Sequence, residues 1–147
     1  MKKQLLMFVL MIATFTSCSL DNDQNTQILT EVMPIESVDM PDQFIRGQDH
    51  EISITYTKPN SCYQFYDVTY IVSGSDRIVT VLNSVYSYDE ANCTGEPEQV
   101  TASLIFTPTS SETHIFKFYQ GENDQGIDQY HLVEVPVLEG RLNTINN

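Results

Sequence analysis

The sequence predicts an all-β fold, a single antiparallel β-sandwich of about seven strands. Short runs in which apolar and polar residues alternate recur from Val32 to Leu138, and Pro, Gly, Asn or Asp residues separate them. No stretch sustains the 3.6-residue period of an amphipathic helix. The chain has 147 residues, which is within the usual size of one domain.

The first expected element is residues 32–45, a strand or edge segment that Pro34 and Pro41 interrupt, because proline cannot donate to a sheet ladder. Residues 51–57 follow and alternate strictly between apolar and polar side chains. The inward-facing residues of this second strand are expected to be Ile52, Ile54 and Tyr56.

A β-hairpin is expected next. Residues 63–72 and 77–88 are joined by Ser-Gly-Ser-Asp at positions 73–76, which favours a tight turn. The expected inward residues of its first strand are Tyr66, Val68, Tyr70 and Val72. In its second strand two sets compete for the inner face, Ile78, Leu82, Tyr86 and Tyr88 against Val79, Val81 and Val85. This competition predicts a bulge or a strand that is covered on both sides.

Three further strands, at residues 100–106, 113–119 and 129–138, complete the expected sandwich. Their expected inward residues are Val100, Ala102, Leu104, Phe106, Phe116, Phe118, Val133, Val135 and Val137. The arrangement resembles immunoglobulin and fibronectin type III domains in architecture only, because the chain has no tryptophan and lacks the inter-sheet cysteine spacing of antibody domains. A small β-barrel is the alternative.

Cys62 and Cys93 stand just outside the two ends of the expected hairpin. With the turn centred on residues 74–75, residue 62 lies opposite about residue 87. A short excursion then brings Cys93 within the ~5.5 Å Cα separation of a disulfide. We therefore expect these two cysteines to pair. The sequence has no C-x-x-C motif and no histidine at ligand spacing from either cysteine, which disfavours a redox or metal site there.

The N-terminal segment, MKKQLLMFVLMIATFTSC, indicates export: two lysines precede an apolar run, and Thr-Ser-Cys follows it. The run is shorter than the ~20 residues that a membrane-spanning helix needs, so it predicts a cleavable signal at residues 1–17. The segment resembles the signal peptide of bacterial lipoproteins, in which a small residue, here Ser17, precedes a cysteine that is lipidated and becomes the mature N-terminus.

This resemblance implies that Cys18 bears the lipid, that residues 18–31 are a flexible tether and that residues 32–147 form the sandwich domain. Several acyl chains would hold the domain stably at a membrane. Ser19 stands where an aspartate would resemble an inner-membrane retention signal. The resemblance therefore favours the outer membrane of a Gram-negative bacterium, on its periplasmic or cell-surface face.

The chain is strongly acidic, with 7 Lys+Arg against 20 Asp+Glu and a formal net charge of −13. Nucleic acids and anionic lipid head groups are bound by clustered Lys and Arg. The composition therefore excludes nucleic acid as a partner, whereas it permits divalent cations and basic proteins.

Two acidic loops are the candidate binding sites. The loop at residues 121–128 joins the last two strands and offers oxygen ligands of the kind that calcium prefers, although it does not match the EF-hand pattern. Its possible cation ligands are Glu122, Asn123, Asp124 and Asp128. A loop that is simply solvated is the alternative. A second polar loop, residues 88–98, has four carboxylates.

No catalytic constellation is evident. His50, His114 and His131 are expected on the surface or rim, no G-x-S-x-G elbow is present, and no carboxylate pair stands out as acid and base. The sequence favours a non-enzymatic, membrane-anchored module that binds an envelope protein or a glycan and needs no cofactor. The alternatives are a small inhibitor or envelope-assembly factor that docks on a basic partner and, last, a hydrolase.

Overall fold

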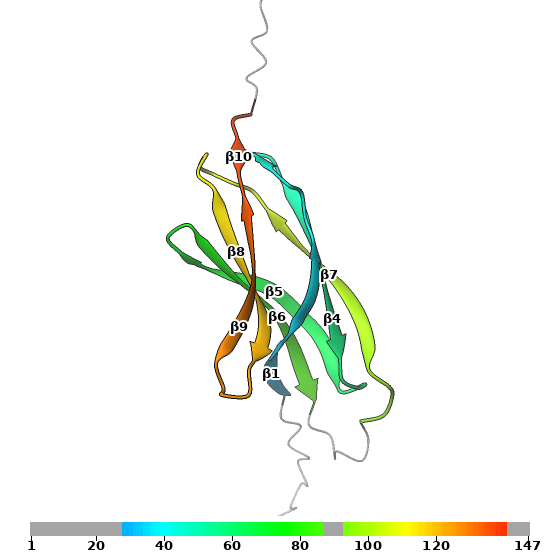
Figure 1. The fold of residues 1–147 in the computed structure, drawn as a ribbon. Coiled ribbons are helices and arrows are strands. Elements are labelled where there is room, and N and C mark those ends of the chain that lie inside the picture. The colour runs from blue at the N-terminus through cyan, green and yellow to red at the C-terminus, as the bar shows by residue number, and fades with distance from the viewer. Residues whose placement is uncertain (1–27, 87–92, 141–147) are drawn as a thin grey trace, which may run out of the picture.

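The computed structural model describes residues 28–86 and 93–140, which form the strands of a two-layer β structure (Figure 1). The strands are β1 (Ile28–Met33), β2 (Ile35–Asp39), β3 (Phe44–Ile45), β4 (His50–Lys58), β5 (Tyr63–Ser73), β6 (Asp76–Tyr86), β7 (Glu98–Phe106), β8 (His114–Glu122), β9 (Asp128–Val135) and β10 (Val137–Leu138). The expected all-β fold is confirmed, and no sheet of the described residues closes into the alternative barrel. Within the same residues no helix could span a membrane.

One layer is a three-stranded antiparallel sheet in the order β2-β4-β7. β4 is central, and its register with β7 is unbroken from His50 opposite Phe106 to Lys58 opposite Glu98. Because side chains alternate along a strand, the three apolar residues expected to face inward, Ile52, Ile54 and Tyr56, are all fully buried.

The other layer is a five-stranded sheet around β6. β5 pairs with β6 as the expected hairpin. The opposite edge of β6 is shared: residues 76–79 pair with β8, and residues 81–86 pair with β1. β9 then pairs antiparallel with β8. β6 and β8 run parallel, because the chain crosses to the other sheet as β7 between them.

The first strand changes sheets at Pro34, where Met33 ends β1 in the larger sheet and Ile35 begins β2 in the smaller one. Proline lacks the N–H that would continue the ladder, so it marks the crossing. β1 begins at Ile28, which corrects the expected tether: residues 28–31 are part of the sheet because they pair with residues 83–86 of β6. The expected signal peptide, Cys18 and the rest of the tether lie outside the described residues.

The interior contains an aromatic cluster in which Phe44, Phe106 and Phe116 lie with ring centroids 5.1–5.8 Å apart. Phe44 comes from β3, which pairs with β10 in a short parallel sheet of its own. Polar side chains share the interior. Asn83 and Tyr56 are fully buried, and neither the Asn83 amide nor the Tyr56 hydroxyl has a hydrogen-bond partner. Burial raises the pKa of Tyr56, and the nearby Asn83 amide opposes the shift.

Two residues of the hairpin were wrongly expected inside. Tyr66 is 64% exposed and Val72 is 57% exposed, whereas Val68 between them is buried as expected. A bulge between Phe65 and Asp67 places Tyr66 outside the alternation. Val72 faces inward by register, but it lies at the turn end of the hairpin, which projects sideways from the sandwich in Figure 1. In β6 the odd-numbered set faces inward, with Val79 and Val81 fully buried.

Candidate functional site

The expected cation loop is a hydrogen-bonded turn between β8 and β9. The side-chain oxygen of Asn123 accepts hydrogen bonds from the backbone N–H groups of Gln125 and Ile127, both at 3.0 Å. The Asn123 N–H in turn donates to the carbonyl of Ile127 at 2.9 Å. No group of three or more His, Cys, Asp or Glu side chains among residues 28–86 and 93–140 could hold a metal ion. The loop residues Glu122, Asp124 and Asp128 accordingly form no such group.

Two of these carboxylates instead lie near tyrosines of the adjoining strands. The Tyr130 hydroxyl donates to a carboxylate oxygen of Asp128 at 3.1 Å. The rings of Tyr130 and Tyr119 meet edge-on with centroids 6.0 Å apart. Burial raises the pKa of both tyrosines, and Asp128 adds to each shift, with Glu122 acting on Tyr119 as well. The end of the larger sheet thus combines aromatic rings with negative charge.

The expected disulfide is present between Cys62 and Cys93, with their Cα atoms 5.3 Å apart. Beside it, Ser61 and Thr94 are joined twice: the Ser61 N–H donates to the Thr94 carbonyl, and the Thr94 N–H donates to the Ser61 hydroxyl, both at 3.0 Å. This double contact fixes the start of β5 against the segment that leads into β7. Residues 88–92 of the second acidic loop lie outside the described part of the chain.

The three histidines do not meet, although β8 and β9 do pair. His114 lies opposite Val135, and His131 lies opposite Phe118. Contrary to the expectation of a rim position, His114 is buried with its ring edge-on to Phe106 at 5.2 Å. Burial lowers the pKa of His114, Arg77 lowers it further and Glu112 opposes this.

His50 is half-buried, and its Nε2 accepts a hydrogen bond from the Ile45 N–H at 2.8 Å. Its ring packs on Phe44 with centroids 4.7 Å apart. Both His50 and His114 therefore belong to the margin of the aromatic cluster, and within the described residues neither is joined to a carboxylate by a hydrogen bond or an ion pair.

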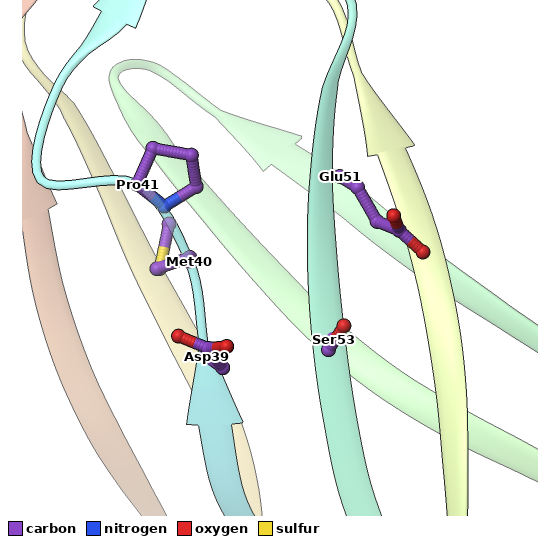
Figure 2. Close-up of a pocket in the computed structure, with 5 residues that line it drawn as sticks. All are labelled: Asp39, Met40, Pro41, Glu51 and Ser53. Carbon is purple, nitrogen blue, oxygen red and sulfur yellow. The ribbon is translucent and has the colours of Figure 1, made fainter.

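A shallow cavity of about 330 Å³ lies at the end of β2 against β4. It is lined by Asp39, Met40, Pro41, Glu51 and Ser53 (Figure 2). The carboxylate of Glu51 turns away from Met40 and Pro41 in this view and accepts a hydrogen bond from the Ser103 hydroxyl of β7 at 2.6 Å. The cavity therefore does not bring two carboxylates together as an acid and a base.

The outer surface of the three-stranded sheet, here called the polar face, consists almost entirely of hydroxyl, amide and carboxylate side chains. By register and burial, its residues are Ser37, Asp39, Glu51, Ser53, Thr55, Thr57, Gln99, Thr101, Ser103 and Ile105. Beside it, Glu36 accepts a hydrogen bond from Gln99 at 2.9 Å. Hydrogen bonds from Thr57 and Gln99 lower the pKa of Glu36. Ile105 is the single large apolar residue in this set and is 57% exposed.

The outer surface of the five-stranded sheet has many more apolar residues, although Thr30, Thr69, Thr80 and Ser84 also face outward on it. Its outward apolar and aromatic residues, here called the apolar face, are Ile28, Val32, Ile71, Ile78, Leu82, Ile115, Tyr119, Tyr130 and Leu132. Ile71 on β5 is 67% exposed and Leu132 on β9 is 58% exposed, so both of these edge strands present aliphatic groups to water. Clusters of exposed apolar side chains mark interaction sites in soluble domains.

Sequence reasoning placed the binding site in the loops or at exposed strand edges and did not single out this face. The signal that could have found it was the competition in residues 77–88, where apolar residues occupy both alternating sets. A strand with one face in water normally alternates apolar and polar residues, so apolar residues in both sets indicate that both faces are covered. Comparison of the chain with protein families, curated proteins and solved structures finds no match.

Proposed function

We propose that this protein is a non-enzymatic binding module that a lipid on Cys18 anchors at the outer membrane. The N-terminal sequence supports the anchor, because a short apolar signal ends in Thr-Ser-Cys. From Cys18 to the first strand residue, Ile28, the chain reaches at most about 33 Å, so the domain would act close to the membrane surface.

The observation that supports binding most directly is the apolar face. Burial of an exposed Leu or Ile side chain is favourable by about 1.5 to 3 kcal/mol. A partner that covered Ile71 and Leu132 would therefore gain a substantial part of its binding free energy from two side chains. The exposed groups are mostly aliphatic, which favours a protein partner over a glycan, since sugars are held mainly on exposed aromatic rings and by polar groups.

Hydroxyl-radical footprinting in the bacterial envelope tests whether this face is occupied. Leu132 and Ile105 form a matched pair, because they lie on opposite outer faces and are 58% and 57% exposed. We expect Leu132 to be oxidised much less in the envelope than in the purified protein, and Ile105 to be oxidised equally in both. Equal oxidation of Leu132 in the two samples would contradict a binding role for this face.

The anchor is tested separately by the variant Cys18→Ser. We expect the unaltered chain to incorporate labelled fatty acid and to sediment with membranes, because more than one acyl chain gives stable attachment. The variant should lose both properties while its sandwich domain stays folded. Membrane association that persisted in the variant without acylation would contradict the proposed anchor.

A further inference from the structure

Charged groups on the larger sheet are distributed unequally around the apolar face. Within the face, Lys117 of β8 forms an ion pair with Asp76 of β6 at 2.5 Å. Lys117 is the only cation among the outward-facing residues of the described strands in this sheet, and Asp76 already neutralises it. The centre of the face therefore has almost no net charge.

The margin of the face is acidic. Asp67 lies on β5 at one edge and Glu134 lies on β9 at the other, and both face outward by register. No Lys or Arg of the described residues forms an ion pair with either carboxylate. At the loop end, Glu122 and Asp128 lie near the tyrosines of the face. The surface is thus an apolar centre within a rim of carboxylates.

This distribution discriminates between possible occupants. A second copy of the chain would bring one acidic rim against another, and each copy has a net charge of −13. An anionic lipid surface would be repelled for the same reason. A protein surface with Lys or Arg around an apolar centre would complement both parts of the face. It would bury the aliphatic groups and pair the rim carboxylates.

We propose that the apolar face docks on a protein whose contact surface is an apolar patch bordered by Lys or Arg residues. This proposal rests on the proposed binding function and adds the location of the site and the chemistry of the partner. The apolar centre provides most of the affinity. The acidic rim provides orientation and a faster approach, which makes binding weaker at high ionic strength.

The experiment uses the full-length, membrane-anchored protein with photo-reactive benzoyl-phenylalanine in place of Leu132 or, as the matched control, in place of Ile105. We expect a cross-linked adduct with one distinct protein from position 132 and none from position 105. Peptide mapping of the adduct should locate the contact beside Lys or Arg residues of the captured protein. An acidic or uncharged contact surface would overturn the proposed chemistry.

Binding of the captured protein, once purified, is then measured with substituted chains. Leu132→Asp should weaken binding by about tenfold or more, because it places a charge in the desolvated centre, whereas Ile105→Asp should leave Kd unchanged. The double variant Asp67→Asn with Glu134→Gln should bind several-fold more weakly at low salt and lose most of the salt dependence. Position 132 is exposed, so neither benzoyl-phenylalanine nor Asp there should disturb the core. Thermal unfolding that matches the unaltered chain would confirm that both variants fold.

The other outcomes separate this inference from the proposed function. An adduct from position 105 alone would leave a binding module but overturn the assignment of the site. An adduct of two copies of the chain, or flotation of the lipid-free domain with phosphatidylethanolamine vesicles, would overturn the basic protein partner. No adduct from either position would contradict the binding function itself.

Discussion

The two sheets of this sandwich resemble each other inside and differ outside. Both bury aliphatic and aromatic side chains on their inner surfaces, as Ile54 of β4 and Phe116 of β8 illustrate. Outside, the three-stranded sheet presents Thr, Ser and carboxylates with one large apolar residue, whereas the five-stranded sheet presents Ile, Leu, Val and Tyr among its Thr, Ser and charged residues. The inner surfaces account for folding, so the unusual outer surface is the one that needs a functional explanation.

The largest expected effect separates the inner and outer surfaces of the same pair of strands. Phe116 is fully buried on β8, and Leu132 on neighbouring β9 is 58% exposed. Phe116→Ala should lower the free energy of unfolding by about 3 to 5 kcal/mol, because it leaves a cavity between the sheets. Leu132→Ala should change it by no more than about 0.5 kcal/mol. Urea denaturation measures both, and a comparable loss in the two variants would show that the apolar face is part of the stabilising core.

The disulfide provides the next largest effect and concerns how the two sheets are joined. It links Cys62, at the start of β5, to Cys93, which precedes β7 of the other sheet, and its sequence separation is 31 residues. The double variant Cys62→Ser with Cys93→Ser should lose about 3 to 4 kcal/mol of stability, since the unfolded chain regains loop entropy. Denaturation of the reduced unaltered chain is the control and should agree with the variant. A loss below about 1 kcal/mol would mean that the strand pairings alone hold the sheets together.

His114 makes the stability of the interior depend on pH. Burial, reinforced by Arg77, lowers the pKa of His114 in the folded state, and Glu112 opposes the shift. The unfolded chain therefore takes up this proton at a higher pH, near 6.5. The contribution of His114 to the free energy of unfolding is fully present above that pH. It decreases as the pH falls towards the lower pKa of the folded state, with a slope of at most about 1.4 kcal/mol per pH unit.

The matched variant for this test is His114→Leu, which removes the titrating group and keeps an apolar side chain beside Phe106. Thermal unfolding between pH 7.5 and 5.5 should show a steeper loss of stability for the unaltered chain than for the variant. Parallel curves would indicate that His114 does not contribute to the pH dependence.

The alternation of residues was enough to predict most strands, because burial on one side imposes a period of two. It placed Ile52, Val68 and Phe116 inside and located the turn between β5 and β6 correctly. The hairpin found in this way also predicted the disulfide, because its register determines which residues lie close together. The strand pattern could not reveal that Tyr66 leaves the alternation, because a bulge adds one residue without changing composition.

The candidate site was harder to predict than the fold. The loop at residues 121–128 has the composition of a cation site, yet Asn123 uses its side-chain oxygen to close the turn. The apolar face is assembled from strands that are distant in sequence, such as β1 and β9, and it depends on which strands share a sheet. The parallel pairing of β6 with β8 determines that arrangement, and pairing between strands that do not follow each other in the chain leaves no local signal in the sequence.

The smallest expected effect compares one ion pair on each sheet. Lys117 and Asp76 beside the apolar face have side chains 32% and 24% exposed, whereas Lys58 and Glu98 on the other sheet are 18% and 68% exposed. Because both partners are largely buried, the Lys117–Asp76 pair should show a coupling free energy of about 1 kcal/mol. The Lys58–Glu98 pair, whose carboxylate is in water, should show only a few tenths.

Double-mutant cycles with Lys→Met and Asp→Asn or Glu→Gln substitutions measure each coupling free energy. The Lys117–Asp76 coupling should also resist added salt better than the other, because apolar neighbours such as Ile78 and Leu132 exclude ions from it. Equal couplings with equal salt dependence would mean that water reaches the apolar face as freely as the polar one. The difference between the two outer surfaces would then be one of composition without an electrostatic consequence.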